Sequence, residues 1–197
     1  MQQTKGLGQF IRNRYGKATD NFLSMDYKLE EIYVRSTDED RALTSAQAML
    51  SGLFPPQGQQ VWDKDIAWQP IPVHSATPGA EDMLLKPTSV ACPEYDKIYE
   101  EENSNIFNDY NIRYKDFFAS ISEMVGWPNL NMSNIDDVYS AIYRERTHNL
   151  TQPAWVDQLW NGTSAYDLIL EMKRITRIAD FNSPRKSKIL GGYLLSD

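Results

Sequence analysis

A single arginine, Arg35, follows a β-rich run at residues 32–34 and precedes small polar and acidic residues. An arginine between the end of a strand and the start of a helix can bind an anion. Ligands of α/β sheets lie beyond the carboxyl ends of strands, and free N–H groups at a helix N-terminus attract negative charge. The planar guanidinium adds a fork of donors that fits phosphate or carboxylate. The alternative is an ordinary ion pair from Arg35 to Asp38 or Asp40.

The sequence offers no obvious nucleophile or metal centre to accompany Arg35. Its two histidines, His74 and His148, are far apart and form no metal-spaced pair. It has no glycine-rich phosphate loop and no Gly-x-Ser-x-Gly motif. Cys92, the one cysteine, has no basic neighbour in sequence that would activate its thiol. We expect His74 to be structural, His148 to be exposed, and neither a metal nor a cofactor to be bound.

The elements around Arg35 can be predicted from apolar spacing. Residues 4–16 have the pattern of a helix, and residues 31–35 have that of a strand. Residues 61–75 form a second extended segment, which two prolines interrupt, so it is predicted to be an edge strand or a loop. The order helix, strand, helix, strand favours the α/β class.

The helix after Arg35 is predicted to start at Ser36, because Ser36 and Glu39 fit a capping box. Pro55 and Pro56 are predicted to stop it. Its expected apolar face consists of Leu43, Ala46, Leu50, Leu53 and Phe54.

The spacing of apolar residues in the second half of the chain differs from that in the first. Apolar spacing predicts three helices, near residues 114–125, 135–143 and 168–179, with no clear strand between them. Turn signals at residues 126–128 and 161–162 separate these helices. A new amphipathic stretch then begins at Ile189, and the chain stops inside it, as if it were cut.

The composition excludes some classes of partner. The formal net charge of −7 argues against binding to nucleic acid or to an anionic membrane surface. No apolar run approaches the roughly 20 residues that span a bilayer, and the N-terminus lacks the apolar core of a signal peptide. Three glycosylation sequons nevertheless begin at Asn131, Asn149 and Asn161, which weakly favours secretion. For Cys92, a missing disulfide partner and a buried free thiol in a cytosolic protein are both open, and composition alone favours the free thiol.

Two motifs resemble the animal histidine acid phosphatases of the lysosomal and prostatic type. They are IYVRSTDEDRALTSAQAMLSGLFPP at residues 32–56 and WQPIPVHS at residues 68–75. The segment GLGQFIRNRYGKATDNFL is similar to the first helix of that family, and YKDF and HNLTQPAW are similar to parts of its helical cap. The final LGGYLLSD is similar to the helix on which the family's chain returns to its α/β core.

The resemblance implies a mechanism and a role for Arg35. In the family, a histidine of an Arg-His-Gly-x-Arg-x-Pro motif attacks phosphorus and forms a phosphohistidine. The arginines of that motif, a third arginine and a second histidine clamp the phosphate. An aspartate of a later His-Asp pair protonates the leaving alcohol. Arg35 matches the third arginine, so the resemblance implies that it clamps phosphate.

Neither of the other two motifs occurs in the 197 residues. The resemblance implies that the first lies before Met1, together with a signal peptide, and that the second lies after Asp197. Cys92 fits a family cysteine, whose disulfide partner would also lie beyond the C-terminus. Arg144 stands where the family tends to carry a cysteine, so another disulfide is expected to be absent by substitution.

We therefore expect an α/β fold of the histidine phosphatase type. Residues 1–86 and 189–197 would form a partial doubly wound sheet domain, and residues 87–188 an inserted helical cap. The expected function is hydrolysis of phosphate monoesters, by a chain that is catalytically incomplete on its own. One alternative is a non-catalytic binding or scaffold protein with the same fold. Another is a relative that acts on inositol or lipid phosphates. The resemblance also implies a lysosomal or extracellular location and a possible homodimer.

Overall fold

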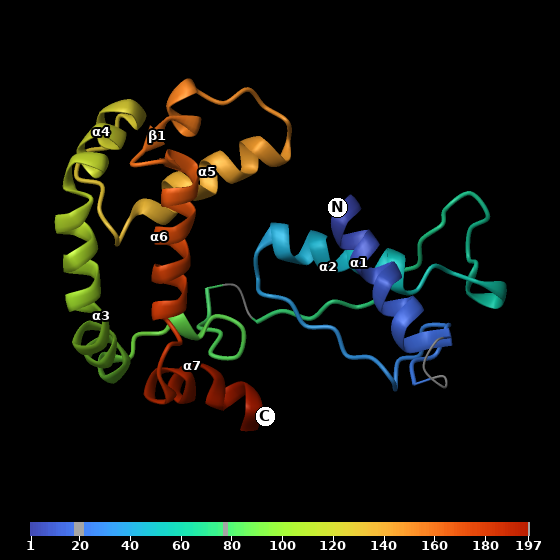
Figure 1. Cartoon of the computed structure of the whole chain (residues 1–197). Helices are drawn as coiled ribbons and strands as arrows, with labels where there is room; N and C mark the ends of the chain where they lie inside the picture. The colour runs from blue at the N-terminus through green and yellow to red at the C-terminus, as the bar shows by residue number, and fades with distance from the viewer. Residues whose placement is uncertain (18–21, 77–78, 197) are drawn as a thin grey trace. The chain divides into compact units, whose positions relative to one another are not determined.

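The computed structural model of the chain describes residues 1–17, 22–76 and 79–196. The chain divides into two compact units, Met1–Val90 and Ala91–Asp197 (Figure 1). Each unit has its own cluster of buried apolar side chains.

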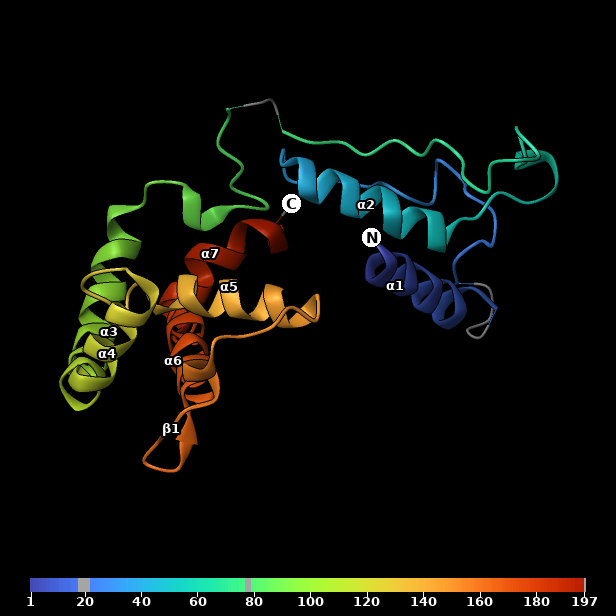
Figure 2. The same cartoon turned by 90° about the horizontal axis from the view of Figure 1, so that it is seen from above.

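Two helices build most of the first unit. Helix α1 (Gln2–Arg12) continues into a π-helical turn (Asn13–Lys17) and packs against helix α2 (Asp40–Leu53), as Figure 2 shows. The two backbones come very close, because a Cβ atom on Gly8 would collide with the carbonyl oxygen of Met49. The helix predicted at residues 4–16 is thus confirmed, and its last part is π-helical instead of α-helical.

The predicted start of the second helix is wrong. Helix α2 begins at Asp40, its N-cap is Glu39, and no side chain caps it. The backbone N–H of Ser36 instead donates to the carbonyl of His74 at 2.8 Å, and the Ser36 hydroxyl donates to the carbonyl of Thr37. Because Ser36 belongs to an extended pairing, it does not start the helix and no capping box forms. The predicted end is confirmed, since α2 ends at Leu53 with Phe54 as its C-cap, and Pro55 follows.

The strand predicted at residues 31–35 is present only as a single parallel bridge between Arg35 and His74. The N–H of His74 donates to the carbonyl of Val34 at 2.9 Å, which is the second bond of this bridge. The extended segment predicted at residues 61–75 is therefore a loop that pairs at one point. Among the described residues of this unit, the buried core consists of Leu50, Leu53, Phe54 and Ile71.

The second unit is mostly helical. It contains helices α3 (Pro93–Arg113), α4 (Lys115–Val125), α5 (Ile135–Thr147), α6 (Ala165–Ala179) and α7 (Pro184–Ser196). Helices α4, α5 and α6 confirm the three that the sequence predicts. Helix α3 was not predicted, because its apolar residues do not gather on one side of the helix as they do in its neighbours.

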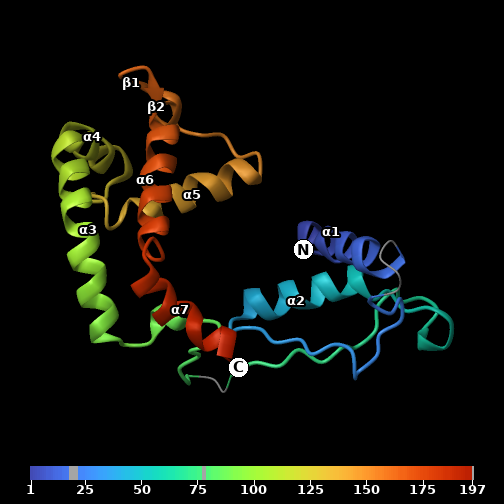
Figure 3. The same cartoon turned by 60° about the horizontal axis from the view of Figure 1, so that its bottom comes forward.

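A short β-hairpin corrects the expectation that this half of the chain has no strand. Strand β1 (Leu159–Trp160) pairs antiparallel with β2 (Thr163–Ser164), as Figure 3 shows. The turn consists of Asn161 and Gly162, which have φ values of 50° and 88°. Two residues with positive φ form the tight turn typical of an Asn-Gly hairpin.

The core of the second unit lies between its helices, and α5 packs directly against α6. Its buried side chains are Phe117, Phe118, Ile121, Leu130, Met132, Ile135, Val138, Ile142, Val156, Ala165, Ile169 and Met172. Among the described residues, the fold is therefore mostly helical with one small two-stranded sheet. The α/β class and the division into a core of 1–86 plus 189–197 and a cap of 87–188 stay predictions.

Candidate functional site

Arg35 lies where the two motifs of the first unit meet. Its backbone pairs in parallel with His74, so the segment that carries Arg35 runs beside residues 68–75. The side chain of Arg35 is 34% exposed, which leaves part of the guanidinium open to solvent. The bridge places Arg35 in an extended segment, whereas its place at the carboxyl end of a strand stays a prediction.

The alternative of an ordinary ion pair named the wrong acids, since Arg35 does form an ion pair but its partner is neither Asp38 nor Asp40. Nη2 of Arg35 donates to Oδ1 of Asp82 at 3.2 Å. Asp38 instead accepts from the hydroxyl of Ser75 at 3.2 Å. Asp40 is the first residue of α2, where a negative charge suits the positive end of the helix.

Asp82 is a residue of this site that the sequence did not reveal to us. Its carboxylate is 5% exposed, and Oδ1 also accepts from the backbone N–H groups of Leu84 (3.2 Å) and Leu85 (3.0 Å). An aspartate directly before an apolar run is a known turn former, so the segment Glu81-Asp82-Met-Leu-Leu was the available signal. That segment of the sequence does not indicate that Asp82 pairs with Arg35.

A second ion pair stands close to the first in sequence. Lys86 donates to Glu39, and Arg41 lies 3.5 Å from the other carboxylate oxygen of Glu39. The hydrogen bond and charge of Lys86, helped by Arg41, hold the pKa of Glu39 below its usual value. Glu39 is therefore a charged residue that two cations neutralise.

A hollow of about 370 Å³ lies beside these pairs. It is lined by Asp38, Glu39, Ala76, Gly79, Ala80, Glu81, Asp82, Lys86 and Ser89. Acids outnumber the one cation in this lining, so the hollow itself does not favour an anion. Arg35 is not among its lining residues.

The structure places both histidines at exposed positions. The ring of His74 stacks on Tyr33, with centroids 4.7 Å apart and an angle of 8° between the planes. His148 is exposed and follows the last turn of α5. Among the described residues, no group of three or more His, Cys, Asp or Glu side chains is arranged to hold a metal ion.

The predicted sequons lie in the second unit. Asn149 and Asn161 are exposed, both with positive φ, whereas Asn131 is half-buried and its side chain accepts from the N–H of Ser133 at 2.8 Å. Exposure at Asn149 and Asn161 is compatible with a glycan. Glycosylation of all three residues stays a prediction.

Cys92 is a half-buried free cysteine at the N-cap of α3. Its disulfide partner stays a prediction. Arg144 is exposed on α5 and lines a hollow together with Lys173 and Arg177 of α6.

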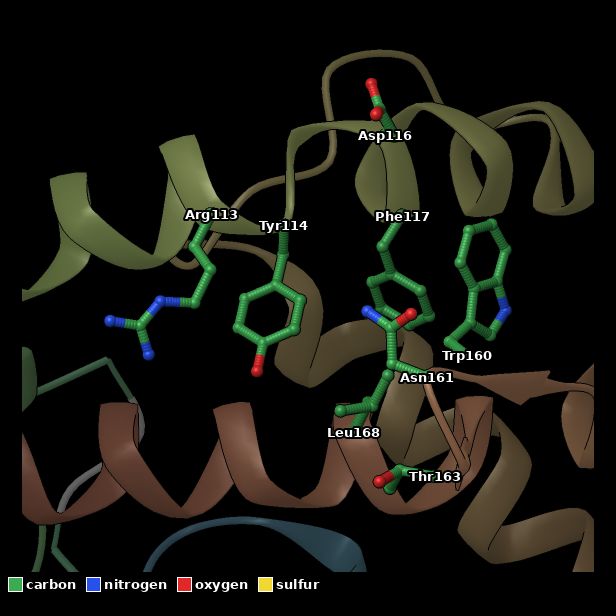
Figure 4. A pocket seen from close by; sticks show the side chains of 8 residues that line it. All are labelled: Arg113, Tyr114, Asp116, Phe117, Trp160, Asn161, Thr163 and Leu168. Carbon is green, nitrogen blue, oxygen red and sulfur yellow. The ribbon is translucent and has the colours of Figure 1, made fainter.

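A further hollow of about 410 Å³ lies in the helical unit (Figure 4). It is lined by Arg113, Tyr114, Asp116, Phe117, Trp160, Asn161, Thr163 and Leu168. The rings of Phe117 and Trp160 meet edge to face at 5.2 Å. Figure 4 shows the carboxylate of Asp116 pointing away from the other labelled side chains.

In the part of the chain that is described, no helix is long and apolar enough to cross a membrane.

Comparison with known proteins gives one consistent result. The profile of the histidine phosphatase superfamily (branch 2) matches residues 1–171. A lysosomal acid phosphatase from Xenopus laevis is 40% identical over 196 residues, which are 99% of this chain and 44% of that protein. Prostatic and lysosomal acid phosphatases from Homo sapiens are each 35% identical over all of this chain, which corresponds to 50% and 45% of those proteins. The chain thus spans about half the length of these relatives.

Proposed function

Because the chain belongs to the histidine phosphatase superfamily, we propose that it contributes to an acid phosphatase that hydrolyses phosphate monoesters. In this proposal Arg35 is a phosphate clamp. The names of the relatives support a phosphatase function.

The observation that carries this proposal is the state of the Arg35 guanidinium. It is 34% exposed and, among the described residues, its one hydrogen bond is the one from Nη2 to Asp82. A guanidinium has five N–H donors, so most of them stay available to an incoming oxyanion. An arginine that is fixed on one side and open on the other is suited to hold phosphate in a single orientation.

The chemistry assigned to Arg35 is electrostatic. Its charge would stabilise the phosphoryl oxygens, where negative charge accumulates as the phosphorus is attacked. By resemblance, a histidine of the family is the nucleophile and an aspartate is the acid. The 197 residues hold neither Arg-His-Gly nor His-Asp. We therefore propose that this chain alone is catalytically incomplete.

Two other functions remain as alternatives within the same proposal. A non-catalytic binding or scaffold protein would keep the fold and Arg35 without turnover. A relative acting on inositol or lipid phosphates would use the same clamp with a different substrate. A lysosomal or extracellular location and a homodimer are likewise proposals drawn from the family.

The test is a titration of the ¹⁵N-labelled chain with sodium phosphate, followed through the Nε–H signals of its arginines. The signal of Arg35, identified as the one missing from the Arg35→Lys variant, should shift and reach saturation. The Arg41→Ala variant is the matched control, because Arg41 is an exposed arginine of the same region whose ion-pair partner is Glu39. Binding that survives unchanged in Arg35→Ala, or is lost equally in Arg41→Ala, contradicts the assignment of the clamp to Arg35.

A further inference from the structure

The feature that goes beyond the proposed clamp is the buried carboxylate behind Arg35. Asp82 is 94% buried as a residue, being 6% exposed, whereas the Arg35 side chain is 34% exposed. The ion pair therefore has a buried end and an open end. A carboxylate buried in this way costs free energy unless it is fully hydrogen-bonded, so its presence needs a reason.

The Asp82 carboxylate is held by the backbone as well as by Arg35. Oδ1 accepts from the N–H groups of Leu84 and Leu85, and the N–H of Lys86 donates to the Asp82 carbonyl at 2.7 Å. These three bonds make a closed turn around Asp82. The turn fixes the carboxylate in place, and Arg35 then binds to a support that is already ordered.

The second oxygen of Asp82 shows that turn formation is not the whole explanation. Oδ2 is buried and has no hydrogen-bond partner among the described residues. An asparagine would close the same turn through its one carbonyl oxygen, without leaving a charged oxygen unsatisfied. A carboxylate is required if its task is to hold a guanidinium, and Oδ2 is a free acceptor for a second N–H of Arg35.

From this geometry we infer that Asp82 is a positioning residue, which holds the guanidinium of Arg35 in the orientation that binds phosphate. This inference rests on the proposed function of Arg35. Asp82 does not touch the phosphate. It binds one edge of the guanidinium and leaves the other donors for the ligand, so the clamp is ordered before the anion arrives.

A purely electrostatic effect of Asp82 predicts the opposite change in phosphate affinity, so it can be distinguished from positioning. If Asp82 were only a nearby negative charge, its removal would strengthen the binding of an anion. If it positions Arg35, its removal weakens binding. Glu81 is the matched control, because it lines the same hollow, is exposed, and carries the same charge one residue earlier.

The experiment uses the full chain with Asp82→Asn and Glu81→Gln, each titrated with inorganic phosphate. The Asp82→Asn variant keeps the oxygen that accepts from the N–H groups of Leu84 and Leu85 and from Nη2 of Arg35. It removes the negative charge and puts an NH₂ donor where Oδ2 would accept a second N–H of the guanidinium. We expect Asp82→Asn to weaken phosphate binding about tenfold, which corresponds to the net contribution of one hydrogen bond between charged groups. Glu81→Gln should leave binding unchanged or tighten it. Binding by Asp82→Asn that equals or exceeds that of the unmodified chain overturns the inference.

A second measurement distinguishes a failure of this inference from a failure of the proposed phosphate clamp at Arg35. The ¹⁵N relaxation of the Arg35 Nε should report an ordered side chain in the unmodified protein and a mobile one in Asp82→Asn. If the unmodified chain does not bind phosphate but Arg35 loses order in Asp82→Asn, the clamp is wrong and the positioning stands. If Arg35 is equally ordered in both proteins, or mobile in both, the positioning is wrong.

Discussion

Gly52 of α2 lies against the backbone carbonyl of Lys5 in α1, so closely that no Cβ atom fits between them. The two helices can approach in this way only because Gly52 has no side chain, and the atom it meets belongs to a helix backbone. Backbone atoms cannot move aside as the end of a flexible side chain can.

We therefore expect Gly52→Ala to lower the free energy of unfolding by about 1–3 kcal/mol, the usual cost of adding a methyl group to a filled contact. Gly6→Ala is the control, because Gly6 is in α1 but has nothing within 4 Å of its Cβ position. That change should stabilise the protein by about 0.4–1 kcal/mol through the unfolded chain. Urea unfolding measures both. Equal stability of the two variants would contradict the close crossing of α1 and α2.

Lys186 gives a second prediction, since it is a lysine whose side chain is 0% exposed. Its Nζ donates to the carbonyl of Ala179 at 2.6 Å, at the end of α6, and lies 3.2 Å from Oε2 of Glu102. Lys186→Met keeps the length of the side chain but removes the donor, and should cost about 1–3 kcal/mol of unfolding free energy, because the carbonyl loses this partner.

The exposed residue Lys188 is the matched control in the same helix, α7. Lys188→Met should change stability by no more than about 0.5 kcal/mol. Thermal or urea unfolding of the two variants decides the matter. A loss in Lys188→Met as large as that in Lys186→Met would mean that the buried hydrogen bond is not the cause.

Glu31 provides a prediction about pH. The hydroxyl of Ser24 donates to Oε1 of Glu31 at 2.6 Å, and Lys28 donates to the same oxygen at 3.0 Å. The Ser24 hydroxyl first, and then Lys28, lower the pKa of Glu31 from 4.5 to about 2. A carboxyl whose pKa is lower in the folded state stabilises that state above the unfolded pKa. This contribution is complete above pH 4.5 and is lost as the pH falls through about 2.

An NMR titration of the Glu31 carboxyl carbon measures this directly. Ser24→Ala should move the pKa of Glu31 back towards 4.5, because it removes the largest cause of the shift. Ser45→Ala is the control, since the Ser45 hydroxyl donates to the carbonyl of Arg41 and not to Glu31. A pKa that is the same in the unmodified protein and in Ser24→Ala would exclude the Ser24 hydroxyl as the cause.

Local patterns in the sequence were enough to predict most helices. Apolar spacing identified α1, α4, α5 and α6, and the double proline located the end of α2. The start of α2 was missed because its capping box competes with a contact distant in sequence. Ser36 pairs with His74, and Glu39 binds Lys86. Such partners are not visible in a window of a few residues.

The candidate site was only half predictable for the same reason. Arg35 is conspicuous because it follows a β-rich run and precedes a helix. Its partner Asp82 comes from a distant loop, and the acids near Arg35 in sequence, Asp38 and Asp40, are not the ones that it contacts.

Helix α3 was not predicted because its apolar residues are spread around the helix.

The last prediction is that the 197-residue chain does not turn over phosphate monoesters at a rate useful for biology. A phosphohistidine mechanism needs a free imidazole in front of the phosphate. The ring of His74, the histidine closest to Arg35 in sequence, is stacked on Tyr33, and its backbone is tied into the bridge with Arg35. Arg35 can hold phosphate, but binding substrate and transition state equally does not speed the chemical step.

An assay of the purified chain with p-nitrophenyl phosphate at acidic pH tests this, with Arg35→Ala measured beside it. Ordinary enzymes turn over about 1–1000 times per second. We expect a rate more than about a hundredfold below that range, and no difference between the two proteins, because catalytic residues that act as a unit contribute little once the nucleophile is missing. Turnover within about a hundredfold of the ordinary range that Arg35→Ala abolishes would show that the chain is catalytically complete and that Arg35 acts with a nucleophile among these residues.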